Sequence, residues 1–158
     1  MPANDAIPLG GTPPTAAHFL LEVDGLSIGT FGGVSGLQLT VSVDEYAEGG
    51  VNGYVHRFPG RVHWPNLVFS RGLTESDNLL QWVNRTAGDG FEAAGGKLVP
   101  STASVTLLDV AGTRLRSYEV EGAFPVRWTG PTLNTAGSAP LTEELEVTHT
   151  GFRSSSTS

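Results

Sequence analysis

The chain has 158 residues, a formal net charge of −7 and no cysteine, and 39% of its residues are hydrophobic. This length suits one domain with one core. The 21 glycines and 10 prolines disfavour a helical bundle, because they interrupt long helices. Without cysteine the chain has no disulfide, no thiol nucleophile and no thiolate metal site.

The charges are distributed unevenly along the chain. Residues 1–50 carry six acidic side chains and no lysine or arginine, whereas residues 51–116 carry a small basic excess. Binding to a phosphate backbone needs clustered cations, so specific nucleic-acid binding is not expected. The sequence has no apolar run of the roughly 20 residues that a membrane helix needs. Its start lacks the basic region of a signal peptide, so we expect synthesis in the cytoplasm.

The two ends differ in composition from the middle. Residues 1–16 are rich in Pro, Gly, Ala and Thr, and residues 154–158 form a small polar tail. Both bury too little apolar surface to offset the entropy of ordering, so we expect flexible ends around a folded domain at residues 17–153. Apolar residues that alternate with polar ones predict at least six strands in this domain. They are Phe19, Leu21 and Val23; Leu37, Leu39, Val41 and Val43; Leu67 and Phe69; Val105 and Leu107; Phe124, Val126 and Trp128; Leu145 and Val147.

The clearest alternation covers residues 37–43. It predicts a strand whose four apolar residues are buried in the core. The polar residues between them, Gln38, Thr40 and Ser42, are then expected on the opposite, wet face.

One helix is predicted in the middle of the chain. The sequence Thr-Glu-Ser-Asp at residues 74–77 resembles a capping box. Leu79, Trp82 and Val83 follow at the spacing of one helical face, and the helix is expected to end between Thr86 and Gly90. The predicted fold is therefore mainly β, a compact antiparallel barrel or sandwich of six or more strands with one flanking helix.

The glycine-rich run at residues 29–36 is not a convincing site. It lacks the lysine of a phosphate loop and leads into a strand, whereas phosphate loops open a helix. Ser35 also lacks a nucleophile elbow, because Leu37 stands where that motif needs glycine.

The remaining candidates for chemistry favour structural roles. The four histidines are far apart in the sequence and are interpreted as solvated or interface residues rather than metal ligands. They are His18, His56, His63 and His149. Glu143, Glu144 and Glu146 could supply paired carboxylates for acid–base work, but the last two alternate with apolar residues, as on the wet face of a strand. We predict no catalytic, cofactor-binding or metal-binding residues, and no enzyme.

Residues 44–58 form a long glycine-rich connection between two predicted strands. Loops of this length are uncommon in compact domains unless they are functional or disordered. This one carries two tyrosines and a valine among charged residues. The composition favours an arm that orders against a partner.

Several motifs in series resemble one protein family. They are FLLEVDG at residues 19–25, FGGVSGL at 31–37, EYAEGG at 45–50, PGR at 59–61 and PNLVFSRG at 65–72. This series is similar to the inner tube proteins of contractile injection systems, which are related to the tail tube proteins of contractile phages and to type VI secretion tube proteins. The resemblance covers roughly residues 17–152.

The resemblance implies a small β-barrel with one helix that assembles into hexameric rings. The rings stack into a hollow tube inside a contractile sheath, and the tube is driven through a target envelope when the sheath shortens. The implied partners are further copies of the chain, the sheath protein, baseplate and terminal cap proteins, and cargo in the lumen. The particle is expected to be a released extracellular injection system, with a phage virion tail as the alternative. The family carries no catalytic residues or cofactors.

The resemblance also assigns roles to residues. The long connection between the second and third strands contacts neighbouring subunits in this family. The implied subunit-interface residues are Asp44, Glu45, Tyr46, Glu48, Val51, Tyr54 and Arg57. The wet-face residues Gln38, Thr40 and Ser42 are then candidates for the lining of the lumen.

Three other functions stay open at this point. The chain could be a tube-initiating baseplate paralogue of the same fold. It could be a small-ligand-binding β-barrel, which predicts a monomer with an internal apolar cavity. It could also be a hydrolase that uses Ser35 or the glutamates at residues 143–146, which predicts turnover that one substitution abolishes.

Overall fold

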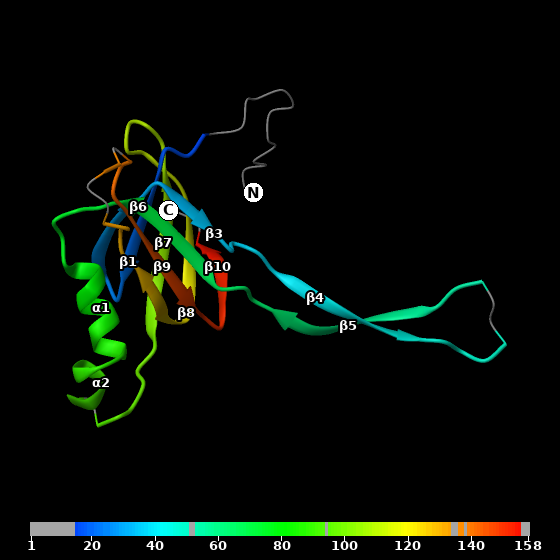
Figure 1. The fold of residues 1–158 in the computed structure, drawn as a ribbon. Coiled ribbons are helices and arrows are strands. Elements are labelled where there is room, and N and C mark those ends of the chain that lie inside the picture. Colours follow the sequence, from blue (N-terminus) through cyan, green and yellow to red (C-terminus); the bar gives the residue numbers. More distant parts are fainter. Residues whose placement is uncertain (1–14, 51–52, 94, 134–135, 138, 156–158) are drawn as a thin grey trace, which may run out of the picture.

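In a computed structural model of the protein, the described residues are 15–50, 53–93, 95–133, 136–137 and 139–155. Within them the chain forms ten strands and two helices (Figure 1). The strands are β1 (His18–Val23), β2 (Leu26–Phe31), β3 (Gly33–Ser35), β4 (Thr40–Tyr46), β5 (His56–His63), β6 (Leu67–Gly72), β7 (Ser101–Leu108), β8 (Arg114–Thr129), β9 (Thr142–Thr148) and β10 (Gly151–Ser155). The helices are α1 (Asn78–Thr86) and α2 (Asp89–Ala93).

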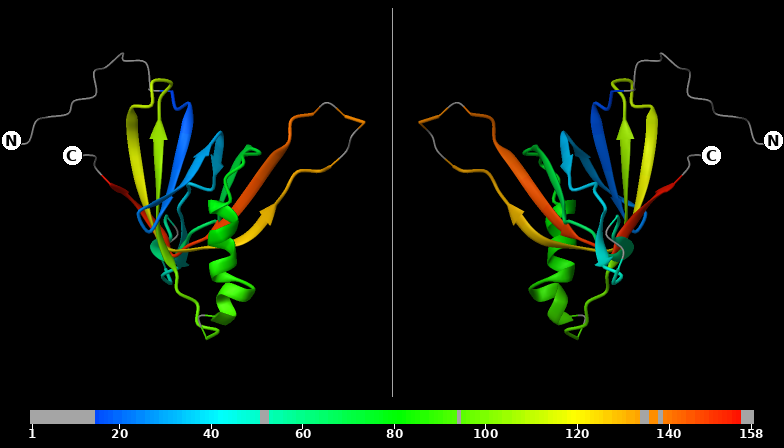
Figure 2. Two further views of the ribbon diagram at one scale, coloured as in Figure 1. Left: turned by 90° about the vertical axis from the view of Figure 1, so that its left-hand side faces the viewer. Right: turned by 90° about the vertical axis from the view of Figure 1, so that its right-hand side faces the viewer.

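Eight of the strands form one antiparallel sheet that bends around β8. The strand order is β2-β1-β7-β8-β9-β6-β3, and β10 also pairs with β8. The first part of β8 pairs with β7 and β10, and its second part pairs with β9. The sheet therefore has two layers that diverge from β8, with α1 beside them (Figure 2). The strand order does not close on itself, so the mainly β body is sandwich-like rather than a closed barrel.

Strand β8 contains a bulge. The pairing of β8 with β9 shifts between Pro125 and Arg127. Proline has no backbone N–H, so it fits a position where the ladder is interrupted. The bulge also turns Val126 outward, where it is 48% exposed, so the predicted alternation of Phe124, Val126 and Trp128 is wrong at its centre.

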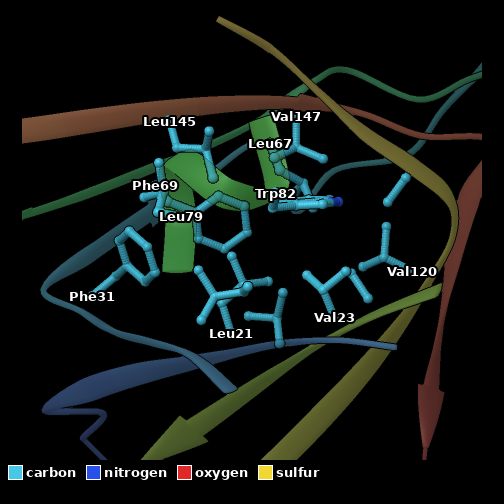
Figure 3. Packing of buried hydrophobic residues seen from close by; sticks show 14 residues of the cluster. Leu21, Val23, Phe31, Leu67, Phe69, Leu79, Trp82, Val120, Leu145 and Val147 are labelled. Carbon is cyan, nitrogen blue, oxygen red and sulfur yellow. The ribbon is translucent and has the colours of Figure 1, made fainter. Parts of the chain in front are cut away.

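The space between the two layers is filled by apolar side chains (Figure 3). The predicted alternations of β1, β6 and β9 are confirmed, because each places two apolar residues in this core. Helix α1 adds Leu79 and Trp82, both 1% exposed, as its predicted spacing requires. The core members are Leu21, Val23, Ile28, Phe31, Leu67, Phe69, Leu79, Trp82, Ala103, Val105, Val120, Ala123, Leu145 and Val147.

The helical region differs from the prediction in two ways. Helix α1 begins at Asn78 rather than within residues 74–77, and the side chain of its N-cap residue, Asp77, makes no capping bond. The Ser76 hydroxyl instead accepts a hydrogen bond from the Asn78 N–H at 3.4 Å. A second helix, α2, follows α1, so the prediction of one helix is wrong. Gly90 allows this close packing, because a Cβ there would overlap the carbonyl oxygen of Asn84.

The ends of the domain are described in part. Strand β10 continues through Ser155, which pairs with Ser117 on β8. It therefore extends beyond the predicted domain boundary at Arg153. Residues 1–14 and 156–158, which belong to the predicted flexible segments, lie outside the described residues.

The strand predicted with most support is not in the core. Leu39, Val41 and Val43 are 52%, 41% and 57% exposed, and Leu37 alone packs against the core. Strand β4 pairs only with β5, and the two strands project from the body as a hairpin (Figure 1). The alternation predicted a strand with one apolar face correctly, but the body of this subunit does not cover that face.

Candidate assembly interface

The projecting hairpin, here called the arm, consists of β4, β5 and the turn between them. Its strands pair antiparallel from Thr40 opposite His63 to Tyr46 opposite His56. The two ends of the connection predicted as a loop, residues 44–46 and 56–58, are therefore strand. An isolated two-stranded hairpin is marginally stable in water, so the arm depends on contacts beyond its own ladder.

The two strands of the arm lose register once. The pairing shifts between Val41 and Val43, which places an extra residue on β5 opposite Ser42. Gly60 fits this bulge because a Cβ there would overlap the Ser42 hydroxyl. That hydroxyl accepts a hydrogen bond from the Arg61 N–H at 2.7 Å. Glycine thus gives the bulge the room it needs, and the backbone N–H of Arg61 has a hydrogen-bond acceptor. The bulge keeps the apolar residues on either side of it on one face of the hairpin.

One face of the arm is apolar. Val41 lies opposite Val62, and Val43 lies opposite Pro59, so the four side chains share one side of the hairpin. Val41, Val43 and Val62 are 41%, 57% and 51% exposed. We call this set the apolar face of the arm. Contiguous exposed apolar surface of this kind marks protein–protein contact sites.

The end of the arm distant from the body carries an aromatic cluster around His56. The His56 ring lies 5.2 Å from the Tyr54 ring and 6.5 Å from the Phe58 ring, measured between centroids. Its Nε2 atom lies 3.2 Å from a carboxylate oxygen of Glu48. Tyr54 and Phe58 are 61% and 55% exposed, so the cluster presents aromatic surface to solvent. Exposed aromatic residues are enriched in interfaces.

An ion pair lies beside the apolar face. The Arg57 Nε atom is 3.3 Å from a carboxylate oxygen of Glu45, and both side chains are more than half exposed. Such surface pairs contribute at most about 1 kcal/mol to folding. Their charges stay accessible to a partner, where they can fix the register of a contact.

The predicted interface residues lie together on the arm. Asp44, Glu45, Tyr46, Glu48, Tyr54 and Arg57 are exposed there, and Val51 lies outside the described residues. Gln38 is exposed in the link before β4, and Thr40 and Ser42 are exposed on β4. The lumen prediction for these three residues relied on burial of their apolar neighbours in the subunit's own core, and that premise is wrong.

Further residues of this surface lie outside the set predicted from the sequence. Phe58 and Val62 lie on the arm beside the predicted set, and both are more than half exposed. The signal that could have found them is the alternation of β5, which the Pro-Gly pair at residues 59–60 interrupts. That interruption is the bulge.

Glu143, the first of the three glutamates considered for acid–base work, is buried. It is 6% exposed, and one carboxylate oxygen accepts a hydrogen bond from Arg71 Nε at 2.6 Å. The other oxygen accepts one from the Trp128 indole N–H at 3.1 Å. The Arg71 guanidinium also lies 4.7 Å from the centre of the Phe31 ring. This closed arrangement holds β6, β8 and β9 together and leaves neither carboxylate oxygen without a partner.

The other predicted candidates for chemistry are held by structural contacts. Glu144 and Glu146 both lie within ion-pair distance of Arg127, at 3.9 and 2.8 Å. Ser35 pairs with Val68 in the sheet, so the glycine-rich run belongs to β2 and β3 and does not open a helix.

Arg153 on β10 donates a hydrogen bond to Glu119 on β8. This bond and the negative charge of Glu119 raise the pKa of Arg153 above its ordinary range.

His149 differs from the predicted solvated or interface histidine. It is 8% exposed and lies between β9 and β10. Across the described part of the chain, no group of three or more His, Asp or Glu side chains is placed to hold a metal ion. Within the same part, neither helix is long and apolar enough to cross a membrane.

The fold agrees with comparisons to known proteins. No curated protein sequence matches the chain significantly. Solved structures with the same fold include a protein of the PVC sheath-tube complex of an extracellular contractile injection system, in its extended state (TM-score 0.75, 21% identity, 94% of this chain and 95% of that chain). Others come from the baseplate of the anti-feeding prophage (TM-score 0.72, 23% identity, 91% and 96%) and from its tube terminating cap (TM-score 0.75, 20% identity, 99% and 100%).

A family model matches nearly the whole described body. Residues 15–153 match the T4-like virus tail tube protein gp19 family, a span that includes every strand from β1 to β9 and the arm. The resemblance of the sequence motifs to tube proteins is thereby confirmed. The chain belongs to the T4-like virus tail tube protein gp19 family, whose members are structural subunits of a tail tube.

Proposed function

We propose that this chain is the subunit that forms the body of the inner tube of an extracellular contractile injection system. In this proposal, six subunits form a ring, the rings stack head to tail, and the tube moves through the target envelope when the surrounding sheath contracts. The tube would also contact a baseplate at one end and a cap at the other, with cargo in its lumen. The family match and the shared fold support this function.

The observation that carries the proposal is the uncovered apolar face of the arm. Burial of a valine side chain contributes about 1.5–3 kcal/mol, so a hairpin with three exposed valines is far more stable against a partner than in water. Copies of the same chain are the natural partner, because a repeated contact between unlike surfaces builds rings and filaments. We assign the interface role to the exposed residues of the arm named above, and the lining of the lumen to Gln38, Thr40 and Ser42.

The experiment removes the end of the arm. A variant lacking residues 49–54 should keep the circular dichroism spectrum of the wild type, because the deletion lies outside the eight-stranded sheet. It should elute as a monomer in size-exclusion chromatography, whereas the wild type should give rings and tubes in negative-stain electron microscopy. Normal rings from the deleted protein would contradict the interface role.

The same images separate the body subunit from a tube initiator. A body subunit is expected to stack into tubes of varying length, since nothing in a head-to-tail contact limits growth. An initiator would give single or paired rings under the same conditions. A wild-type protein that stays monomeric under all conditions would contradict both roles.

A further inference from the structure

The arm joins the body through two short links that touch each other. Residues 36–39 lead from β3 into β4, and residues 64–66 lead from β5 into β6. Gly36 has a φ of +90°, and a Cβ there would overlap the carbonyl oxygen of Asn66 in the other link. The Asn66 side-chain amide donates a hydrogen bond to Glu146 on β9 at 3.2 Å. The links are therefore packed against each other and against the sheet.

The return link rests on the turn between β9 and β10. The Trp64 ring lies 6.1 Å from the His149 ring and 5.0 Å from the Phe152 ring, measured between centroids. Gly151 allows this approach, because a Cβ there would lie 3.1 Å from the Trp64 indole. Proline fixes its own φ and restricts the residue before it, so Pro65 stiffens the link. We call this contact between the return link and the β9–β10 turn the arm root.

His149 makes two hydrogen bonds at the arm root that require opposite roles of its ring nitrogens. Nδ1 accepts from the Gly151 N–H at 3.1 Å, because a backbone N–H can only donate. Nε2 lies 2.9 Å from the Pro65 carbonyl oxygen, which can only accept, so Nε2 carries the proton. Both bonds exist together only in the neutral Nε2–H tautomer. A second proton on Nδ1 would face the Gly151 N–H and remove that bond.

The charged groups around the root have other partners. Glu146 on β9 pairs with Arg127 at 2.8 Å. Glu119 and Glu121 on β8 both lie within ion-pair distance of Arg153 on β10. His63, at the end of β5, is exposed next to the root. Among the described residues no acidic side chain forms an ion pair with His149, so none compensates a charge on its buried ring.

We propose that His149 is a positioning residue that fixes the direction of the arm, and that it does so only while its imidazole is neutral. The imidazole ties the carbonyl of Pro65, in the arm's return link, to the turn that starts β10. Protonation keeps the Nε2–H bond to Pro65, but it removes the bond from the Gly151 N–H and places an uncompensated charge on the buried ring. The root then loosens to hydrate that charge, and the arm no longer points in one direction relative to the body. The importance of this for assembly rests on the proposed function of the arm, but the orientation of the arm can be measured without assembly.

The test measures the distance between two spin labels, one on the arm and one on the body, by double electron–electron resonance spectroscopy. The chain has no cysteine, so the changes Arg61→Cys and Ala111→Cys introduce the only two labelling sites, one on the exposed part of β5 next to the bulge and one on the exposed turn after β7. The labelled monomer is examined at about pH 8 and about pH 5, on either side of the range in which histidines titrate. We expect a narrow distance distribution at the higher pH and loss of the narrow peak at the lower pH.

Two variants at position 149 isolate the effect from the other histidines. In His149→Gln the side-chain amide offers one donor and one acceptor but does not titrate. This variant should keep the narrow peak at both pH values, and His149→Ala should lack it at both. Circular dichroism checks that each variant is folded.

Three results would overturn the inference. They are a narrow peak in folded His149→Ala, a narrow peak in the wild type at the lower pH, and a loss of the narrow peak in His149→Gln at the lower pH. If His149→Ala does not fold, the comparison of the wild type with His149→Gln still decides. Failure of the wild type to form rings at the higher pH, with the predicted peaks present, would contradict the proposed function and leave the arm root as inferred.

Discussion

At the scale of single residues, the body is held by one buried ion pair among apolar side chains. Arg71 and Glu143 are 7% and 6% exposed, and their pairing is completed by the Trp128 indole. Removal of one partner from a buried pair leaves an uncompensated charge in a low-dielectric interior, whereas replacement of both by apolar residues is often neutral or stabilising. We therefore expect the protein to tolerate the replacement of Arg71 and Glu143 only when both are changed together.

This predicts the outcome of two variants. Glu143→Ala should lower the free energy of unfolding by about 3–5 kcal/mol, because the Arg71 charge stays buried without its partner. The double variant Arg71→Met with Glu143→Leu should recover most of that loss. Urea unfolding followed by circular dichroism gives both values, and a single-variant loss below about 1 kcal/mol would show that water reaches Arg71.

A second prediction at this scale concerns Trp82. Its side chain is 1% exposed and lies between the two layers, so Trp82→Ala should leave a cavity that lowers the free energy of unfolding by about 3–5 kcal/mol (Figure 3). Val110→Ala is the control, because Val110 is 89% exposed and its truncation should change stability by less than about 0.5 kcal/mol. The same urea titrations apply, and equal effects of the two changes would contradict the burial of Trp82.

At the scale of elements, the arm separates folding from assembly. Its apolar face contributes little to the folded monomer because nothing in the described body covers it, yet that face is the surface a partner would bury. Val43→Lys should therefore change the free energy of unfolding by less than about 0.5 kcal/mol and abolish ring formation. Val110→Lys, on the exposed turn after β7, should change neither quantity. Rings of Val43→Lys with normal yield in negative-stain images would show that this face is not part of the interface.

At the scale of the whole molecule, the subunit carries a net charge of −7, and its polar β4 residues are proposed to line the bore. Thr40→Lys should then add one cation per subunit around the lumen, where facing walls concentrate the field. Rings should still form, since no apolar contact is lost, and retention of anionic cargo should become salt-dependent. Electron cryo-microscopy of the variant tubes checks the placement directly. Density for the new side chain on the sheath-facing surface would exclude the lumen role of Thr40.

Sequence patterns predicted the body well because its strands and its core lie in one chain. The alternations of β1, β6 and β9 and the helical spacing of Leu79 and Trp82 each report burial inside the subunit, and all four are confirmed. The same reasoning failed for β4, whose alternation is equally regular. A period of two shows that one face avoids water, but it does not show whether the same chain or another copy covers that face.

The polar residues of the body were harder to predict for a different reason. Glu143 shares its strand face with Leu145 and Val147, which a strict period of two indicates, yet a carboxylate on a buried face is plausible only once its partner is known. That partner, Arg71, lies on β6 at a separation of 72 residues. His149 presents the same difficulty, since its acceptor at Pro65 lies 84 residues away in the sequence. Pairings of this kind depend on topology, which composition and periodicity do not encode.

The arm root has a consequence for the order of events during synthesis. The pairing of β4 with β5 is local, so these strands can begin to pair before the long-range pairings of the eight-stranded sheet are possible. His149 lies 84 residues after Pro65, in the β9–β10 turn that receives Trp64. In a nascent chain the arm therefore lacks the contact with the β9–β10 turn that fixes its direction. We expect an arm in this state to dock poorly on finished subunits. We expect the late position of His149 to delay the proposed assembly until the sheet that bears the arm is complete.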